Sequence, residues 1–301
     1  KKIQYSAIYM QHTDANAPIL SEVLGLQKKW AAMHYLDWNI SKKLTIGLFD
    51  AVLWQDADSS GKRGFDATYA NPIIFLRAAE YNTASSDNAL VGLTLKYKIN
   101  SSTKIYGQLM LDELKVSEYT ANKGWWANKF AMQLGVKSAK VFGIQNTFGF
   151  TEINLAKPYM YTHRNSQRSY SHFNDALAHP LGANFIESVS RLEQQYKNFR
   201  TFIQINYARY GADSATGNVG NNILLSYNTR NSEYGNKILQ GVNSSLLYVD
   251  ARLAYVINPK VNFCIELGYV YRNQQTAGQV NSANQITLAL KTGFRNLYWD
   301  R

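Results

Sequence analysis

The stretch Leu246–Arg272, LLYVDARLAYVINPKVNFCIELGYVYR, decides the fold class of this chain. From Leu247 onward the odd positions are apolar, while the even positions include Asp250 and Arg252. After a proline-containing turn the alternation resumes, with Glu266 on the polar side. A strict period of two over two long runs predicts a pair of antiparallel β-strands.

Both runs are long enough to cross a membrane. Each exceeds the roughly five or six residues of an ordinary soluble strand and has the roughly nine to eleven positions that a tilted transmembrane strand needs. Strands of soluble β-sandwiches alternate in the same way, so the residues at the ends of the runs distinguish a sandwich from a transmembrane barrel. Tyr255, Tyr269 and Tyr271 fall near strand ends, where aromatic girdles meet the membrane interface. We therefore predict an all-β fold, a transmembrane antiparallel β-barrel of the outer membrane.

Composition agrees with a barrel and excludes a helical membrane protein. The 301 residues fit a single barrel domain, residues 1–301. Mean hydropathy is −0.32, and no apolar run approaches the roughly 18 residues of a spanning helix. The 21 Tyr and 6 Trp suit the aromatic belts of a barrel. The single cysteine, Cys264, is expected to be a reduced filler without chemistry.

The charge balance suggests acidic partners. The net charge is +11 and the isoelectric point is about 9.5, which favours anionic ligands. Nucleic acid is not expected, because the chain has no dense Lys/Arg run and no nucleic-acid motif. Lipopolysaccharide phosphates or an acidic surface polysaccharide fit better beside outer-membrane lipid. No cofactor is expected, since no Gly-rich phosphate loop is present.

The alternation recurs along the whole chain and predicts about twelve spanning strands. The predicted strands are Ile3–Gln11, Lys29–Ile40, Leu44–Gln55, Ala89–Ile99, Thr103–Leu114, Lys129–Phe142, Asn146–Lys157, Phe185–Tyr196, Thr201–Tyr210, Leu246–Ile257, Val261–Arg272 and Gln285–Tyr298. Short turns alternate with long loops, as in barrels with periplasmic turns and external loops. This order predicts loops at the cell surface and a periplasmic C-terminus.

Three segments do not follow the simple pattern. Asn71–Glu80 contains a strand-like run, but counting it as a spanning strand would reverse the order of turns and loops. We therefore expect Gln55–Asn88 to be one external loop that folds back into the barrel mouth, or equally a β-extension above the membrane. Asn221–Tyr227 is treated in the same way. Asp50 falls on the apolar side of its strand, which predicts a β-bulge near Phe49.

Strand parity also predicts the charged side chains that face the lumen. They are Lys96, Lys98, Lys104, Lys129, Lys137, Arg252, Arg272, Lys291 and Arg295, with the acidic Asp37, Asp112, Asp250 and Glu266. The favoured interpretation is a network of mutually paired charges, with Asp250, Arg252 and Glu266 pairing locally, because buried charges need partners. The alternative is an anion-attracting lumen or mouth, because low-dielectric walls focus the field of unpaired cations.

The predicted loop from Pro158 to Asn184 is unusually rich in aromatic and basic residues. Its candidate glycan-binding side chains are Tyr159, Tyr161, His163, Arg164, Arg168, Tyr170 and His172. Aromatic rings stack on sugar faces, and arginine can bind a carboxylate or phosphate through two N–H groups. The alternative is that the loop packs over the barrel with its own aromatic rings.

Neither a metal site nor catalysis is expected in this loop. His163, His172 and His179 match no standard zinc spacing, and no cysteine accompanies them. Ser171, His172 and Asp175 could be assembled into a hydrolytic site. Any serine-rich loop that carries a histidine offers such a set, however, so we predict a protein that is not an enzyme.

Three stretches carry a resemblance: Asn71–Arg77, Gly124–Phe130 and Tyr159–Phe185. The third, with THRN at 162–165 and AHPLGANF at 178–185, is the most specific. Together they resemble the Bacteroidota members of the Wzi capsule-assembly family, also described as RemB-type gliding-motility proteins. The similarity runs along the whole chain.

The resemblance implies a plugged outer-membrane barrel of about eighteen strands, of which this chain would be the C-terminal portion, with about six strands before Lys1. Relatives in this family act as surface lectins that anchor capsular polysaccharide, and RemB-type proteins are tied to surface motility. No ligand residue is carried over, because the family's glycan contacts are not fixed by a compact motif.

The predicted function is a non-enzymatic outer-membrane barrel that binds or organises cell-surface polysaccharide through basic, aromatic external loops. Two alternatives stay open. One is a structural partner subunit of a gliding-motility or secretion assembly, which would contact other outer-membrane proteins. The other is a passive porin.

Overall fold

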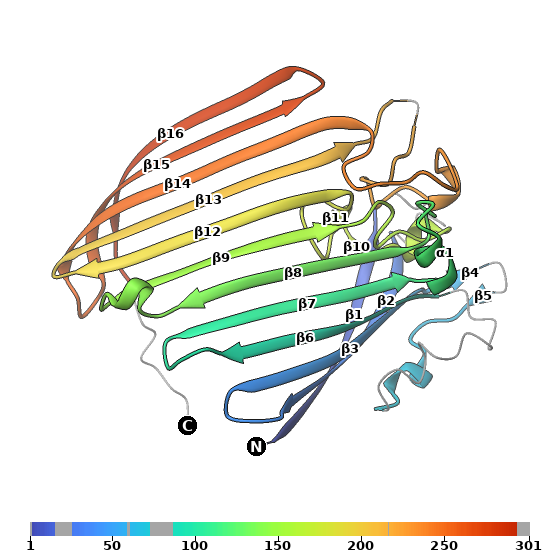
Figure 1. Ribbon diagram of the computed structural model, residues 1–301, viewed down its shortest axis with the longest axis horizontal. Helices are drawn as coiled ribbons and strands as arrows, with labels where there is room; N and C mark the ends of the chain where they lie inside the picture. The colour runs from blue at the N-terminus through green and yellow to red at the C-terminus, as the bar shows by residue number, and fades with distance from the viewer. Residues whose placement is uncertain (1, 16–25, 59–60, 73–86, 216, 294–301) are drawn as a thin grey trace.

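The computed structural model describes residues 2–15, 26–58, 61–72, 87–215 and 217–293. Twelve long strands form one antiparallel sheet in which sequence neighbours pair (Figure 1). They are β1 (Ile3–Asp14), β2 (Gln27–Asn39), β3 (Leu44–Gln55), β6 (Asn88–Lys98), β7 (Thr103–Glu113), β8 (Lys129–Ser138), β9 (Thr147–Ala156), β12 (Phe185–Tyr196), β13 (Phe199–Ala212), β14 (Val242–Asn258), β15 (Phe263–Thr276) and β16 (Gln279–Lys291). Each of the twelve predicted strands overlaps one of these, so their number and order are confirmed.

The other elements are short. They are β4 (Ala57–Asp58), β5 (Gly61–Lys62), η1 (Ala67–Ala70), α1 (Val116–Ala121), η3 (Val141–Gly143), η4 (Ser166–Arg168), β10 (Ser171–His172), β11 (Asp175–Ala176) and η5 (Tyr227–Thr229). Within the described ranges, no helix has the length and apolar character needed to span a membrane. Residues 221–227 form no strand of the sheet, so they belong to the loop between β13 and β14.

Short turns join the strands at one end of the sheet, and the long loops gather at the other end (Figure 1). Lys291, the last residue of β16, pairs with Cys264, which follows the short turn between β14 and β15. The last strand therefore runs toward the short-turn end, as predicted. β1 and β16 are the two edges, and no pairing between them is found among the described residues.

One predicted long loop is a tight turn instead. Only Ala277 and Gly278 separate β15 from β16. Both have a positive φ, 51° and 80°, as a two-residue hairpin turn requires. The predicted start of the last strand at Gln285 was too late, because the apolar residues in 279–284, Val280 and Ala283, do not alternate with a period of two. Its predicted end at Tyr298 lies outside the described residues.

The two faces of the last strands differ as the alternation predicts. Leu253, Leu267 and Leu288 are direct cross-strand partners, and they are 47%, 52% and 78% exposed. Arg252 and Glu266 lie on the opposite face, where their side chains approach within 3.9 Å. An apolar outward face and a charged inner face are the pattern of an outer-membrane barrel wall.

Asp50 does not mark a bulge. β3 pairs with β2 and β6 without a register shift, and Asp50 lies opposite His34 on the outward face. Asp50 is nevertheless only 4% exposed and His34 only 6% exposed. The covering element is η1, whose Tyr69 carbonyl lies 3.0 Å from His34 Nε2. The predicted bulge is therefore wrong, because protein rather than lipid covers this part of the outer wall.

The described part of the loop between β3 and β6 lies on this outer wall. The rings of Trp54 and Tyr69 pack 4.6 Å apart in a cluster separate from the inner core. Trp54 Nε1 also donates to the Gly64 carbonyl at 2.9 Å. The predicted fold-back into the barrel mouth is therefore wrong for residues 61–72. Residues 73–86, which carry most of the strand-like run, lie outside the described residues.

The segment 157–184, here called the plug loop, covers the inner face of the sheet near the long-loop end. Its Met160, Tyr161 and Tyr170 belong to the main hydrophobic core, together with Leu90 of β6 and other inward residues of the wall. Met160 and Leu90 are fully buried. The core of the molecule therefore lies between the wall and the plug loop.

Candidate functional site

Two buried lysines of the wall hold the plug loop in place. Lys29 of β2 donates to the Ser169 carbonyl at 2.9 Å. Lys129 of β8 donates to Asp112 at 2.8 Å and to the Thr162 carbonyl at 3.3 Å. Both lysines are at most 1% exposed. A buried cation needs such partners, so these contacts fix the position of the loop.

The loop backbone adds further contacts to the wall. Asp112 also accepts the backbone N–H of Tyr161 at 2.9 Å. Thr13 of β1 donates its N–H to His172 Nδ1 at 3.0 Å and accepts the N–H of Phe173 at 3.0 Å. Asn165 donates to Gln55 of β3 at 2.7 Å. The plug loop is therefore tied to β1, β3 and β7 as well as to the two lysines.

Two neighbouring loops close over the plug loop. Tyr159 donates its N–H to the Gly220 carbonyl and its hydroxyl to the Asn218 carbonyl, both at 2.9 Å. Trp126, from the loop that contains α1, packs edge-on against Tyr159 at 6.1 Å. The Arg230 guanidinium stacks on the same tryptophan, 4.3 Å from the ring centroid. Aromatic packing therefore seals this end of the wall with three loops.

Most of the predicted glycan-binding side chains lie inside this packing. The buried ones are Tyr159, Tyr161, His163, Arg168 and Tyr170, while Arg164 is exposed and His172 is half-buried. Burial, with the nearby Arg168 and Lys129 charges, lowers the pKa of His163 to about 4, so this ring is neutral at physiological pH. A glycan lying above the loop could reach Arg164 but not the buried rings.

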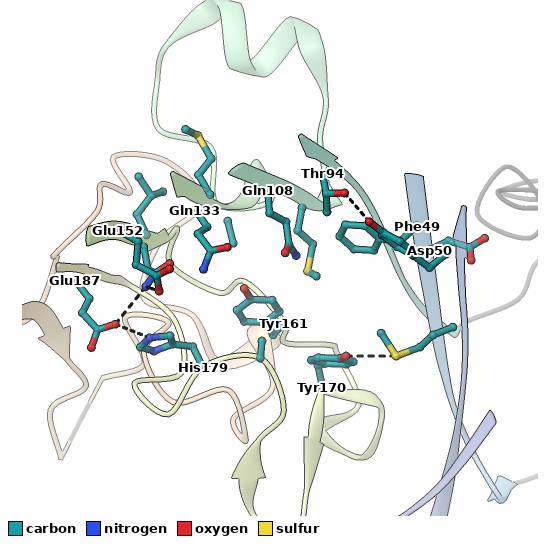
Figure 2. Close-up of a pocket in the computed structure, with 18 of the residues that line it drawn as sticks. Phe49, Asp50, Thr94, Gln108, Gln133, Glu152, Tyr161, Tyr170, His179 and Glu187 are labelled. Atoms are coloured by element: carbon teal, nitrogen blue, oxygen red, sulfur yellow. Dashed lines mark hydrogen bonds and ion pairs between the residues drawn. The ribbon is translucent and has the colours of Figure 1, made fainter. Parts of the chain in front are cut away.

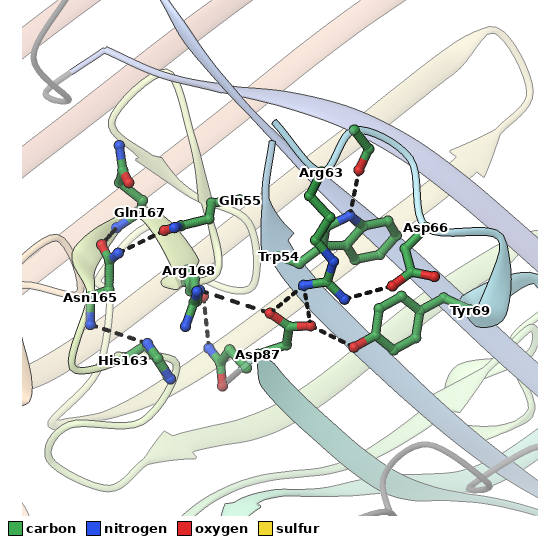
Figure 3. Close-up of polar contacts among 12 residues, drawn as sticks. Trp54, Gln55, Arg63, Asp66, Tyr69, Asp87, His163, Asn165, Gln167 and Arg168 are labelled. Carbon is green, nitrogen blue, oxygen red and sulfur yellow. Dashed lines mark hydrogen bonds and ion pairs between the residues drawn. The ribbon is translucent and has the colours of Figure 1, made fainter. Parts of the chain in front are cut away.

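Arg168 joins the plug loop to the segment on the outer wall (Figure 3). Its carbonyl accepts the Asn88 side chain at 3.0 Å, and its Nε lies 3.9 Å from Asp87. Asp87 in turn accepts Arg63 at 2.7 Å and the Tyr69 hydroxyl at 2.5 Å. Arg168 is thus engaged with protein groups, which leaves little of its guanidinium for an external anion.

A cavity of about 580 Å³ lies between the plug loop and the wall (Figure 2). Tyr161 and Tyr170 line it from the loop, with their rings stacked 6.2 Å apart at 29°. The inner faces of β1 to β3, β6 to β9 and β12 supply the other side. Figure 2 shows the Asp50 side chain directed away from the cavity, in agreement with its outward register.

The wall of the cavity carries a few polar side chains among apolar ones. Gln108 and Gln133 are direct cross-strand partners on β7 and β8, and both side chains project into the space (Figure 2). Neither amide, nor the Tyr161 hydroxyl, has a hydrogen-bond partner among the described residues. Polar groups that are buried or half-buried need a partner, from water or from a ligand. These groups therefore offer donors and acceptors to a bound molecule.

Two carboxylates add to these polar groups. Glu152 accepts the Tyr106 hydroxyl at 2.6 Å. Glu187 pairs with His179 of the plug loop at 2.9 Å. Asn154 lies between them, 3.2 Å from Glu152 and 3.4 Å from Glu187. The cavity therefore combines amides, carboxylates and aromatic rings, which is the chemistry that hydroxyl-rich ligands use.

The predicted hydrolytic set is not assembled in the plug loop. Ser171 Oγ accepts Lys29 at 2.9 Å, and His172 Nδ1 accepts the Thr13 N–H. Within the described ranges, Ser171 and His172 share no hydrogen bond, and no group of His, Cys, Asp and Glu side chains could hold a metal ion.

The predicted lumen charges fall into two groups. Paired ones are Asp112 with Lys129, Lys96 with Asp37, Arg252 with Asp250 and Glu266, and Lys291 with Glu266. Arg272 donates to Gln274 at 2.7 Å. Lys98, Lys104 and Lys137 have no carboxylate within 4.0 Å in the described part of the chain. Arg295 lies outside the described residues.

Sequence reasoning missed the cavity side chains Gln108, Gln133, Glu152 and Glu187. They come from four different strands, so together they form no sequence motif. Parity was the available signal, but the runs that carry Glu152 and Glu187 do not alternate cleanly, and Gln108 and Gln133 carry no charge that would mark them. Which inward residues lie under the plug loop depends on the path of that loop, which alternation does not describe.

No protein-family model matches the chain, and neither does the sequence of any curated protein. Among solved structures, the chain is similar to Wzi of Escherichia coli, described as an outer-membrane protein involved in group 1 capsule assembly and a carbohydrate-binding β-barrel. The identity is 12% and the TM-score 0.57, over 94% of this chain and 54% of that one. OprD of Pseudomonas aeruginosa aligns at 10% identity and a TM-score of 0.46, over 97% of this chain and 67% of that one.

These similarities concern the fold alone. This chain spans about half the length of the Wzi structure. The twelve antiparallel strands, and the scarcity of helix in the part of the chain that the structure describes, agree with that comparison. The chain therefore has a Wzi-like outer-membrane β-barrel fold.

Proposed function

We propose that this chain forms part of an outer-membrane barrel that binds cell-surface polysaccharide without chemical turnover. The observation that carries the proposal is the cavity beneath the plug loop, where Tyr161 and Tyr170 face the free amides of Gln108 and Gln133. Aromatic rings can stack on the apolar faces of sugars, while amides bind their hydroxyl groups. Tyr161 and Tyr170 of the predicted glycan-binding set thus remain in the proposal. They would contact the sugar on the inner side of the plug loop and not on its outer surface.

The cavity favours uncharged sugar units. Glu152 and Glu187 are the lining carboxylates on the inner face, whereas the Asp50 side chain is directed away from the cavity. Carboxylates repel an acidic sugar but accept hydrogen bonds from hydroxyl groups. In this proposal the long loops face the cell surface, the C-terminus lies in the periplasm, and the outward apolar face contacts outer-membrane lipid and lipopolysaccharide. The carbohydrate-binding description of Wzi supports the proposal.

The test is binding of the detergent-purified protein to an array of neutral and acidic bacterial oligosaccharides. We expect the Gln108→Ala/Gln133→Ala variant to bind neutral sugars about tenfold more weakly, because two net hydrogen bonds are lost. The matched control is Gln204→Ala/Gln285→Ala, on the inner faces of β13 and β16 and outside the cavity lining. Equal binding by both variants and the wild type would remove the cavity from the proposal.

A structural subunit of a surface motility or secretion assembly is the second candidate. It is favoured by the outer wall at β2 and β3, where the polar His34 and Asp50 face outward under residues 61–72. Phe65 of that covering segment is 42% exposed and offers an apolar contact to another protein. The RemB-type resemblance of Tyr159–Phe185 points in the same direction. Stoichiometric partners in detergent extracts, lost on Phe65→Ala, together with no binding on the oligosaccharide array, would favour this function.

A further inference from the structure

Three lysines form a row on the inner face of the wall, near the short-turn end. Lys98 pairs directly with Lys104, and Lys104 pairs directly with Lys137, across β6, β7 and β8. Their parity is that of Leu90, Met110 and the other inward residues of these strands. The Lys43 carbonyl accepts the Lys98 N–H at 2.8 Å, so a fourth lysine adjoins the row.

This row is electrostatically unfavourable by itself. Neighbouring strands are about 4.8 Å apart, so the three ammonium groups start from closely spaced positions. Like charges directly opposite each other on a sheet are destabilising. Within the described ranges, no carboxylate lies within ion-pair distance of the three side chains, and Lys137 has only the Tyr106 ring, 4.9 Å from its Nζ.

Several other cations on the same face have a carboxylate partner. Lys96 has Asp37 at 3.8 Å, and Arg191 pairs with Glu193. The nearby Glu152 carboxylate is already bonded to the Tyr106 hydroxyl. The row is therefore a local excess of positive charge on a wall that is not basic throughout. Lys98 and Lys137 are exposed and Lys104 is half-buried, so an anion can reach all three.

We propose that Lys98, Lys104 and Lys137, assisted by Lys43, bind a soluble polyanion that carries carboxylate or phosphate groups at regular intervals. A linear row of cations suits a linear series of anions, since each added contact relieves repulsion between neighbouring lysines. A lipid headgroup is a poor fit, because these side chains share the inner face with the core and not the outward apolar face. The site is separate from the sugar cavity, and it does not depend on sugar binding there.

The probe for this site is a fluorescently labelled oligogalacturonate, added to the detergent-purified protein, with a labelled dextran oligosaccharide as the neutral reference. We expect the protein to bind the acidic probe and not the neutral one. This binding should weaken as the salt concentration rises, because ions screen exposed charge contacts. The Lys98→Gln/Lys104→Gln/Lys137→Gln variant should bind it about tenfold more weakly. Its Tm should equal or exceed that of the wild type, because the substitutions remove repulsion.

The matched control is Lys42→Gln/Lys197→Gln/Lys260→Gln, which removes the same charge from exposed turns at the same end of the sheet. Equal weakening in both triple variants would overturn the proposal, and so would unchanged binding in the first. If inorganic phosphate at the same total charge displaced the labelled probe as well as unlabelled oligogalacturonate does, the row would not require a polymeric anion. The Gln108→Ala/Gln133→Ala variant should keep full affinity for oligogalacturonate, which separates failure of this site from failure of the cavity.

Discussion

β3 and β16 belong to one sheet but meet different surroundings. From Ala51 to Trp54, every residue of β3 is at most 5% exposed. The inner side of this run packs against the plug loop and its outer side against residues 61–72. On β16, by contrast, Ile286 and Leu288 are 75% and 78% exposed. One strand is covered on both faces by protein, whereas the other leaves its outward face for lipid.

The difference shows when alternation is informative. A strand between lipid and a polar lumen must alternate, because each face has one kind of neighbour. A strand covered on both faces by protein can carry apolar residues at successive positions, as Leu53 and Trp54 do, and can carry a charge outward, as Asp50 does. Stability should therefore be concentrated in the covered part of the wall.

The strongest test of whether stability is concentrated in the covered part of the wall is to remove the buried cation beneath the plug loop. Lys129→Met leaves Asp112, whose side chain is 2% exposed, without its partner at 2.8 Å. Removing one member of a buried pair costs about 3–5 kcal/mol, because the other charge stays buried. We expect that loss in urea unfolding of the detergent-solubilised protein, together with faster proteolysis within the plug loop.

The control for this variant lies on the uncovered strands. Lys291→Met removes a cation from Glu266, but the two side chains are 44% and 16% exposed. Water replaces the lost contact, so the cost should be about 1 kcal/mol or less. Equal losses in the two variants would show that coverage by the plug loop does not concentrate stability.

The same difference explains how much could be predicted. Strand number, pairing order and outward face followed from residues such as Leu253 and Leu267, because lipid imposes a simple pattern on them. The predictions were wrong where the strands do not alternate between lipid and lumen. The outward position of Asp50 was missed because a loop covers it. The turn at Ala277 and Gly278 was missed because the residues on either side of it are mostly polar and show no apolar alternation.

The candidate site was less accessible to sequence reasoning. The composition of the plug loop marked it as unusual, and two of its tyrosines do line the cavity. Whether a ring points outward or inward depends on the path of the loop. Tyr159 and Tyr161 have positive φ values of 63° and 71°, a costly conformation for bulky residues that only tertiary contacts can impose. Gln108 and Gln133 became candidates only once that path was known.

A second prediction compares two tryptophans on the outward face. Trp54 is fully buried under residues 61–72, whereas Trp38 on the neighbouring strand is 50% exposed. Trp54→Ala should cost about 3 kcal/mol, the lower end for such truncations, because the covering segment can partly collapse into the space. Trp38→Ala should cost less, since detergent or lipid refills the site. Urea unfolding of both variants measures the difference, and a larger loss at Trp38 would contradict the coverage of this wall by protein.

The smallest expected effect is on the pH dependence of the free energy of unfolding, and it involves only His163 of the plug loop. Burial lowers the pKa of His163 to about 4 in the folded protein, compared with about 6.5 for an unperturbed histidine. The unfolded state therefore binds the proton first as the pH falls. The stability that the neutral ring contributes is full above about pH 6.5 and declines toward pH 4, with a loss of about 2 kcal/mol by pH 5.

His163→Gln should remove this part of the pH dependence, because the variant has no ring to protonate. The free energies of unfolding of wild type and variant, measured from pH 8 to pH 5, should converge or cross as the pH falls. Trp54→Ala keeps His163 and should retain the full acid-induced loss, although it starts from a lower stability. Parallel curves for wild type and His163→Gln would mean that this histidine is accessible to protons in the folded state, so the plug loop would not seal its own interior from solvent.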